Sequence, residues 1–149
     1  MSIVANVLVG LVAVLHLWFL VLEMFLWTKP GGRQVFGTDK EFAEASKALA
    51  ANQGLYNGFL VAGLVWGLVA ERDDVKLFFL GCVVVAGVFG AITVSRRILY
   101  VQAVPALVAV GAVYIARSRV LARLKEEVQL LEEGERIAGV PGQIAVHAS

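Results

Sequence analysis

Charged residues are scarce in this 149-residue chain, because 17% of its residues are Asp, Glu, Lys or Arg whereas 59% are hydrophobic. Soluble domains carry about a quarter charged residues and a smaller apolar fraction. The mean hydropathy of +0.79 points the same way. The composition therefore disfavours an ordinary soluble domain and favours a membrane protein. A net charge of +1 provides no basic surface for nucleic acid, and we expect no nucleic-acid partner.

Residues that bind metals are equally scarce. Cys82 is the single cysteine, which excludes a disulfide within the chain and a paired-cysteine zinc motif. Of the two histidines, His16 lies in an apolar run and His147 lies close to the C-terminus. A b-type haem normally needs two axial histidines inside the membrane. We therefore expect no metal site and no cofactor.

The N-terminal apolar segment lacks the basic residues that begin a secretory signal peptide. The first basic residue is Lys29, and the apolar run 3–27 is longer than the roughly 7–15 residues of a signal-peptide core. A helix needs about 20 apolar residues to cross the hydrocarbon layer of a bilayer. We therefore interpret this segment as a retained membrane span.

Four segments of the chain have the composition of membrane-spanning helices. The predicted spans cover approximately residues 3–27, 53–70, 75–95 and 97–116, and the second is the inner part of a longer helix from Lys40. The last three spans are joined by short connections, which favours antiparallel packing of consecutive helices. The sequence therefore predicts an all-α fold, an integral membrane antiparallel four-helix bundle occupying residues 1–117.

The chain continues beyond the fourth span as a predicted amphipathic helix at residues 118–134 and a flexible tail at residues 135–149. One stripe of this helix is apolar and consists of Leu121, Leu124, Val128 and Leu131. This stripe is a candidate contact with a second copy of the chain. Small-residue faces around Gly54–Gly58 and Gly87–Gly90 are a second candidate, and packing inside one subunit is the alternative for them.

The orientation in the membrane is weakly encoded, because basic residues lie on both sides of the predicted bundle. An even number of spans places both termini on the same side. A dense basic cluster follows the fourth span and favours the cytoplasm for that side. It consists of Arg117, Arg119, Arg123 and Lys125.

Polar residues of the predicted spans gather at one end of the bundle, where the first and third spans end and the second and fourth begin. Ionisable groups at membrane depth are costly and are therefore functional candidates. The candidate ligand-binding residues at this end are Glu23, Trp27, Asn52, Gln53, Asn57, Arg96, Arg97, Tyr100 and Gln102.

His16 and Glu23 are the ionisable residues of the first span and the candidate catalytic residues. Their helical spacing puts them about 10.5 Å apart along the axis, too far for a direct hydrogen bond. Each therefore needs a partner from another helix or from water. Glu23 pairs with Arg96 or Arg97, or it lines a polar pocket beneath a loop at residues 31–38 and a helix at residues 40–51. His16 is a satisfied core histidine, a proton-relay group or the floor of that pocket.

Three blocks of sequence are distinctive: residues 16–27 (HLWFLVLEMFLW), residues 49–58 (LAANQGLYNG) and residues 101–106 (VQAVPA). Together they resemble domain-of-unknown-function family 1304, a bacterial family of small four-span membrane proteins, over residues 3–117. The resemblance implies a multi-pass protein of the bacterial inner membrane with no assigned activity. It supplies no substrate and no catalytic residue, and the segment from Ser118 is longer than expected for the family.

The leading hypothesis is a one-sided polar pocket inside the membrane that binds a small amphipathic or lipid-like ligand for transport or sensing. Apolar walls with a few convergent polar groups are typical of ligand sites. One alternative is a membrane-embedded enzyme that uses Glu23 or His16 as acid or base on a lipid, isoprenoid or quinone substrate. The other is a structural or interaction protein. Membrane lipid is an expected partner in all three cases.

Overall fold

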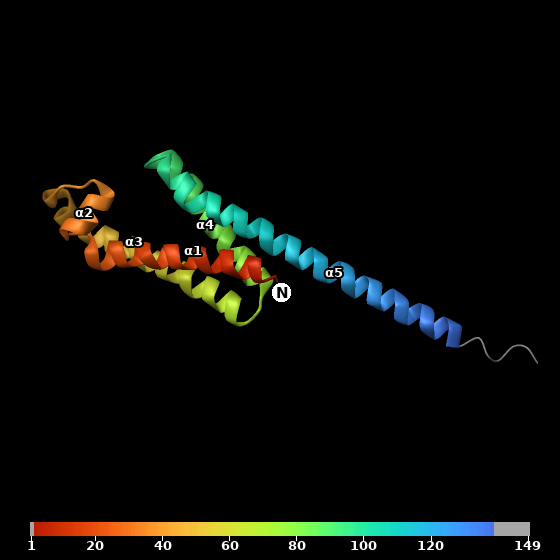
Figure 1. Cartoon of the computed structure of the whole chain (residues 1–149). Coiled ribbons are helices and arrows are strands. Elements are labelled where there is room, and N and C mark those ends of the chain that lie inside the picture. Colours follow the sequence, from red (N-terminus) through yellow and green to blue (C-terminus); the bar gives the residue numbers. More distant parts are fainter. Residues whose placement is uncertain (1, 139–149) are drawn as a thin grey trace, which may run out of the picture.

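All regular secondary structure in the computed structural model, which describes residues 2–138, is helical. The elements are α1 (Ile3–Val21), η1 (Leu22–Leu26), α2 (Pro30–Phe36), α3 (Lys40–Val69), α4 (Asp73–Thr93), η2 (Leu99–Ala103) and α5 (Val104–Ala138), where η1 and η2 are π-helical turns. Figure 1 shows α1, α3, α4 and the first part of α5 grouped together, while the rest of α5 projects away from them. The prediction of an all-α fold is confirmed.

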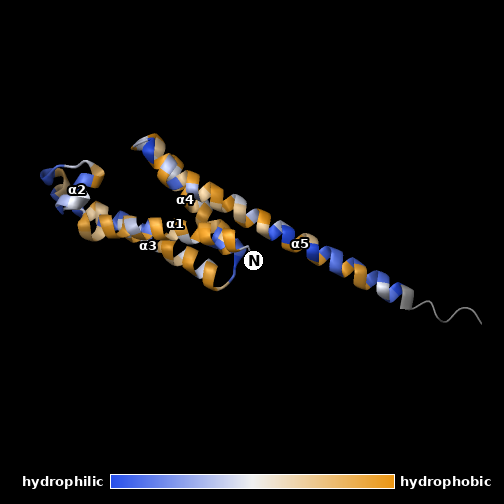
Figure 2. Ribbon diagram, in the orientation of Figure 1, coloured by the Kyte–Doolittle hydropathy of each residue, from blue (hydrophilic) through white to orange (hydrophobic). Residues whose placement is uncertain are grey.

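The core of the bundle is narrow and is built from small and branched side chains. Each long helix contributes to it, and its buried members include Val9, Val12, Leu64, Leu80, Val83, Ala109 and Val113. Most large apolar side chains point outward instead, as Val69 and Ile92 do at 80% exposure each. Figure 2 shows apolar residues over the grouped helices and more hydrophilic residues along the distal part of α5. An exposed apolar surface of this extent indicates contact with lipid or with a partner.

Three helical segments of the described chain are long and apolar enough to cross a membrane: Ile3–Leu26, Asp73–Thr93 and Leu99–Arg136. They overlap the first, third and fourth predicted spans. The second predicted span lies in α3, which does not meet the same criterion. The amides of Asn52, Gln53 and Asn57 explain this, because they lower the mean hydropathy where the apolar part of α3 begins.

Two segments differ from the predicted boundaries. The fourth span continues without a break into the amphipathic helix, and α5 extends to Ala138, so residues 135–138 are helical rather than a flexible tail. The rest of the predicted tail, 139–149, lies outside the described residues. The segment predicted as a loop at residues 31–38 contains α2, which begins at Pro30. Proline suits the first position of a helix, where no intrahelical partner exists for a backbone N–H.

Glycines of α3 and α4 allow close contacts between helices of the same chain. A Cβ atom on Gly54 would lie 3.2 Å from the Cβ of Glu23, and one on Gly87 would lie 2.8 Å from the backbone nitrogen of Ala103. The small-residue faces are therefore occupied inside one subunit. The apolar stripe of the distal α5 is exposed, with Leu131 at 71%.

Replacing Gly87 with alanine should destabilise the protein, because the new methyl group would meet the backbone of η2. Overpacking of this kind typically costs about 1–3 kcal/mol. The matched control is Gly81→Ala on the same helix, where no atom lies within 4 Å of the added Cβ. We expect a lower thermal midpoint for Gly87→Ala alone, followed by circular dichroism in detergent. Equal midpoints for the two variants would contradict the packing of Gly87 against η2.

Candidate functional site

Glu23 lies in η1 and forms a hydrogen bond with α3. The Asn57 side-chain amide donates to Glu23 Oε2 at 2.8 Å and also lies 3.3 Å from the carbonyl oxygen of Gln53. Gly54 sits one turn earlier on α3 and permits the close approach of the two helices described above. Within residues 2–138, Asn57 is the hydrogen-bond partner of the Glu23 carboxylate. Its second oxygen, Oε1, therefore keeps its capacity to accept a hydrogen bond.

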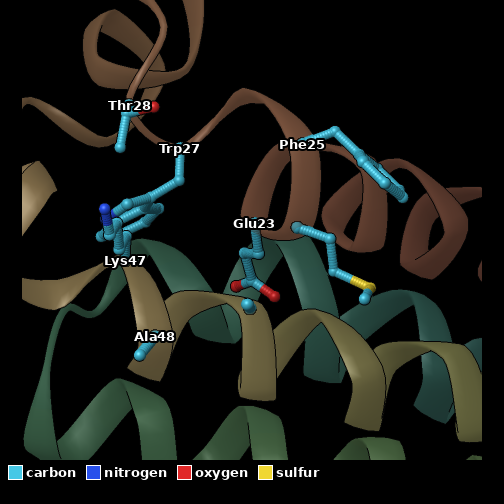
Figure 3. Close-up of a pocket in the computed structure, with 8 residues that line it drawn as sticks. Glu23, Phe25, Trp27, Thr28, Lys47 and Ala48 are labelled. Atoms are coloured by element: carbon cyan, nitrogen blue, oxygen red, sulfur yellow. The ribbon is translucent and has the colours of Figure 1, made fainter.

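A pocket of about 350 Å³ opens beside Glu23. Its walls come from η1, from the residues after it and from the N-terminal half of α3, and they consist of Glu23, Met24, Phe25, Trp27, Thr28, Lys47, Ala48 and Ala51. In Figure 3 the Glu23 carboxylate points from η1 toward the ribbon of α3. The pocket therefore combines one carboxylate, one ammonium group and apolar surface.

Lys47 is the cation of this pocket. Its Nζ atom lies 3.5 Å from Oε2 of Glu44, and both side chains are at least half exposed. Exposed ion pairs with this spacing stabilise a helix by only a few tenths of a kcal/mol, about 0.3–0.5. The Lys47 ammonium is therefore weakly held, and a ligand anion could compete for it.

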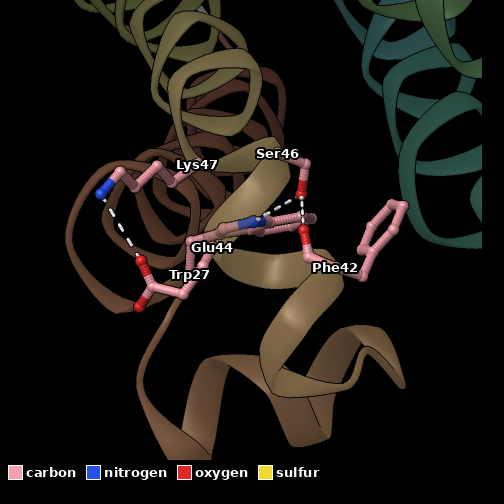
Figure 4. A network of polar contacts seen from close by, with 5 residues as sticks. All are labelled: Trp27, Phe42, Glu44, Ser46 and Lys47. Carbon is pink, nitrogen blue, oxygen red and sulfur yellow. Dashed lines mark hydrogen bonds and ion pairs between the residues drawn. The ribbon is translucent and has the colours of Figure 1, made fainter.

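Trp27 connects the end of η1 to the start of α3 and holds one wall of the pocket in place. Its indole N–H donates to Ser46 Oγ at 3.1 Å, and the Ser46 hydroxyl donates to the Phe42 carbonyl at 2.6 Å (Figure 4). The Phe42 backbone N–H in turn donates to Asp39, which caps the N-terminus of α3. The Trp27 ring also packs against Phe36 of α2, with centroids 4.8 Å apart.

His16 is fully buried, and both of its ring nitrogens have partners. Nδ1 lies 2.8 Å from the Val12 carbonyl oxygen, and Nε2 lies 3.1 Å from the amide nitrogen of Gln102. A carbonyl oxygen only accepts, so Nδ1 carries a proton and the Gln102 amide donates to Nε2. His16 is therefore a neutral imidazole that connects α1 to η2. This geometry is that of a core histidine with both nitrogens satisfied.

Two of the polar residues that join helices lie in π-helical turns, Glu23 in η1 and Gln102 in η2. Such turns are rare and occur frequently at functional sites. Pro105 gives a reason for η2, because it has no N–H to donate to the carbonyl of Val101. The N–H of Val104 donates to Leu99 instead, which is the five-residue spacing of a π-turn.

Within residues 2–138, the remaining predicted binding residues form no hydrogen bond or ion pair with Glu23. The side chains of Arg96, Arg97 and Tyr100 are exposed, and the turn that carries them lies apart from α2 in Figure 1. Within residues 2–138, no ion pair joins Glu23 to an arginine. Asn52 and Gln53 are exposed on α3. The structure therefore joins Asn57 to Glu23 by a hydrogen bond and places Trp27 in the same pocket as Glu23, whereas Gln102 joins His16.

A buried lysine at the opposite end of the bundle shows that polar groups are not confined to the end at which the sequence predicted them to gather. Lys76 of α4 is 1% exposed, and its Nζ atom lies 2.9 Å from Asp73 Oδ1 and 3.2 Å from Asn6 Oδ1. In the sequence, Lys76 is readily taken for an exposed charge near a membrane boundary. Two features of the sequence could have indicated that Lys76 is paired: the i, i+3 spacing of Asp73 and Lys76, and the location of Asn6 at the same end of the predicted bundle.

The arrangement defines a small helical protein with apolar outer faces and polar pairs between its helices. Residues 10–114 match the family described as protein of unknown function (DUF1304). The chain is also 31% identical over 107 residues to the uncharacterized protein YpaA of Lactococcus lactis subsp. lactis (strain IL1403), covering 68% of this chain and 89% of that protein. The chain belongs to the DUF1304 family, as its three sequence blocks predicted. No solved structure matches it.

His16 and Gln102 should be energetically coupled, because either substitution alone leaves a polar group without its partner. We expect His16→Leu and Gln102→Leu each to destabilise the protein by about 1–3 kcal/mol. The double variant should lose clearly less than the sum, measured by thermal unfolding in detergent. Pairing His16→Leu with Asn57→Leu is the control, since Asn57 bonds to Glu23 instead. Additive losses for His16 and Gln102 would contradict a shared hydrogen bond.

Proposed function

We propose that the protein binds a small amphipathic or lipid-like molecule in the pocket beside Glu23, in a transport or sensing role. The observation that carries this proposal is the Glu23 carboxylate, which faces a pocket and is held by one amide. A ligand hydroxyl or amine would donate to the free oxygen of Glu23. Met24 and Phe25, which line the same pocket and are 38% and 63% exposed, would contact its apolar part.

The proposed setting of this pocket is a bacterial inner membrane that the chain crosses four times. The three long apolar segments supply three crossings, and α3 supplies the fourth, because it packs against both α1 and α4. The apolar part of α3 from Leu55 carries outward-facing Phe59, Val65 and Trp66, which suit contact with lipid. Both termini lie on the cytoplasmic side in this proposal, next to the basic segment of α5.

Cysteine labelling tests this topology. In a Cys82→Ala background, Gln34→Cys on α2 should react with a membrane-impermeant maleimide in intact cells, and Arg136→Cys on α5 should react only after permeabilisation. Both parent side chains are exposed, so burial does not limit either reaction. Labelling of both positions in intact cells would show an odd number of crossings and would overturn the four-crossing arrangement.

Glu23→Gln should remove the bound molecule while preserving the fold, because glutamine keeps the shape and can still accept from Asn57. Loss of a hydrogen bond to a charged group is worth about 1.5–3 kcal/mol, roughly a tenfold or larger fall in occupancy. The measurement is mass spectrometry of organic extracts of the purified full-length protein. Glu41→Gln is the control, since Glu41 is an exposed carboxylate of α3 outside the pocket.

The same extracts separate the alternative functions. An extract in which the wild-type protein and Glu23→Gln hold the same molecules in the same amounts would contradict the pocket. A chemically altered product formed by the wild-type protein would instead support an enzyme that uses Glu23. An enzyme that uses His16 as acid or base is disfavoured, because both ring nitrogens are already engaged.

A further inference from the structure

A second groove lies at the opposite end of the bundle, where α5 leaves the other helices. It encloses about 460 Å³ between the N-terminal end of α1 and α5. Its apolar wall includes Val4, Ala112 and Ile115, and its outer part contains Arg119 and Arg123. The groove is therefore amphipathic, with an apolar side toward the bundle and two cations where α5 emerges.

Arg119 and Arg123 are four residues apart, so they lie on one face of α5. Within residues 2–138, neither has an acidic partner. A guanidinium group presents paired donors that match phosphate oxygens, and it binds them more strongly than a neutral donor does. Two unpaired guanidinium groups beside an apolar wall suit a ligand that carries a phosphate on an apolar chain.

The charge pattern along α5 favours a lipid over a second copy of this chain. Basic residues occupy the part nearest the bundle, from Arg117 to Lys125, and acidic residues follow from Glu126 to Glu135. Two copies in one membrane would run parallel at this helix, which would set basic residues beside basic residues. Anionic phospholipids attract basic residues at the membrane surface and repel acidic ones, which matches the observed order.

The inner end of the groove is polar. A smaller cavity shares Ser2, Ala116 and Val120 with the groove and reaches Asn6 and Asp73. The Asp73 carboxylate does not oppose an anion strongly, because Lys76 neutralises it at 2.9 Å. This inner wall therefore offers hydrogen bonds to headgroup hydroxyls without excluding a nearby phosphate.

We propose that this groove binds the anionic headgroup of a phospholipid, with the phosphate at Arg119 and Arg123 and an acyl chain along Val4 and Ile115. The site lies outside the Glu23 pocket and does not depend on it. It rests only on the proposed membrane insertion of α1 and α5.

The test uses the full-length protein in neutral detergent, with dioleoylphosphatidylglycerol and dioleoylphosphatidylcholine as probes and native mass spectrometry as the readout. The wild-type protein should retain phosphatidylglycerol in preference to phosphatidylcholine. Arg119→Gln combined with Arg123→Gln should weaken phosphatidylglycerol binding about tenfold. The control combines Arg117→Gln with Lys125→Gln, which removes two charges from the same part of α5 without altering the groove lining.

Each outcome decides the proposal. A selective loss in the Arg119 and Arg123 variant supports the groove. Equal losses in the test and control variants would show a general attraction to the basic segment and would overturn it, as would a wild-type protein without preference for phosphatidylglycerol. Glu23→Gln should leave phosphatidylglycerol binding unchanged, so failure of the Glu23 pocket and failure of this groove give different results.

Discussion

The arrangement of the bundle depends on the need of each polar group on α1 and η1 to find a partner inside the chain. Polar groups removed from water cost several kcal/mol, roughly 2–7, unless they are hydrogen-bonded. Asn6 accepts from Lys76 of α4, His16 bonds to Gln102 of η2, and Glu23 accepts from Asn57 of α3. The first helix therefore makes one specific polar contact with each of its three neighbours, spread along its length. Apolar packing alone tolerates rotation and sliding of helices, whereas these three contacts favour one register.

Small residues and irregular backbone make these contacts geometrically accessible. Gly54 lets η1 approach α3 at Glu23, and Gly67 leaves space for the stem of Lys76, whose Cγ atom would lie 2.8 Å from an added Cβ. Pro105 favours the π-turn that contains Gln102. Each polar contact thus has a nearby residue that lacks either a side chain or a backbone donor. Glycine and proline weaken an isolated helix, so the contacts made in the packed bundle explain their positions.

The sequence predicted the helical class, the family and the end of the bundle at which Glu23 meets the amides of the second span. These follow from long apolar runs, distinctive motifs and antiparallel order, which are properties of the chain itself. The surroundings of Arg96 and Arg97 were predicted poorly. Antiparallel order fixes the end of the bundle at which a residue lies, but it does not fix how far apart the helices are at that end. Lys76 was missed for a related reason. A lysine near a helix start reads as exposed unless the helices facing it are known, and Asn6 and Asp73 become its partners only after packing.

The polar side chains between the helices differ in how many of their donor and acceptor sites have a partner. His16 has partners at both nitrogens, and the charge of Lys76 is matched by a carboxylate and an amide oxygen. Glu23 receives one hydrogen bond from a neutral amide, although a carboxylate can accept about four. A carboxylate in a helix with apolar faces is costly when part of its acceptor capacity stays unused. The spare acceptor capacity of Glu23 beside a pocket is the reason that the proposed binding site lies at η1 rather than at Lys76.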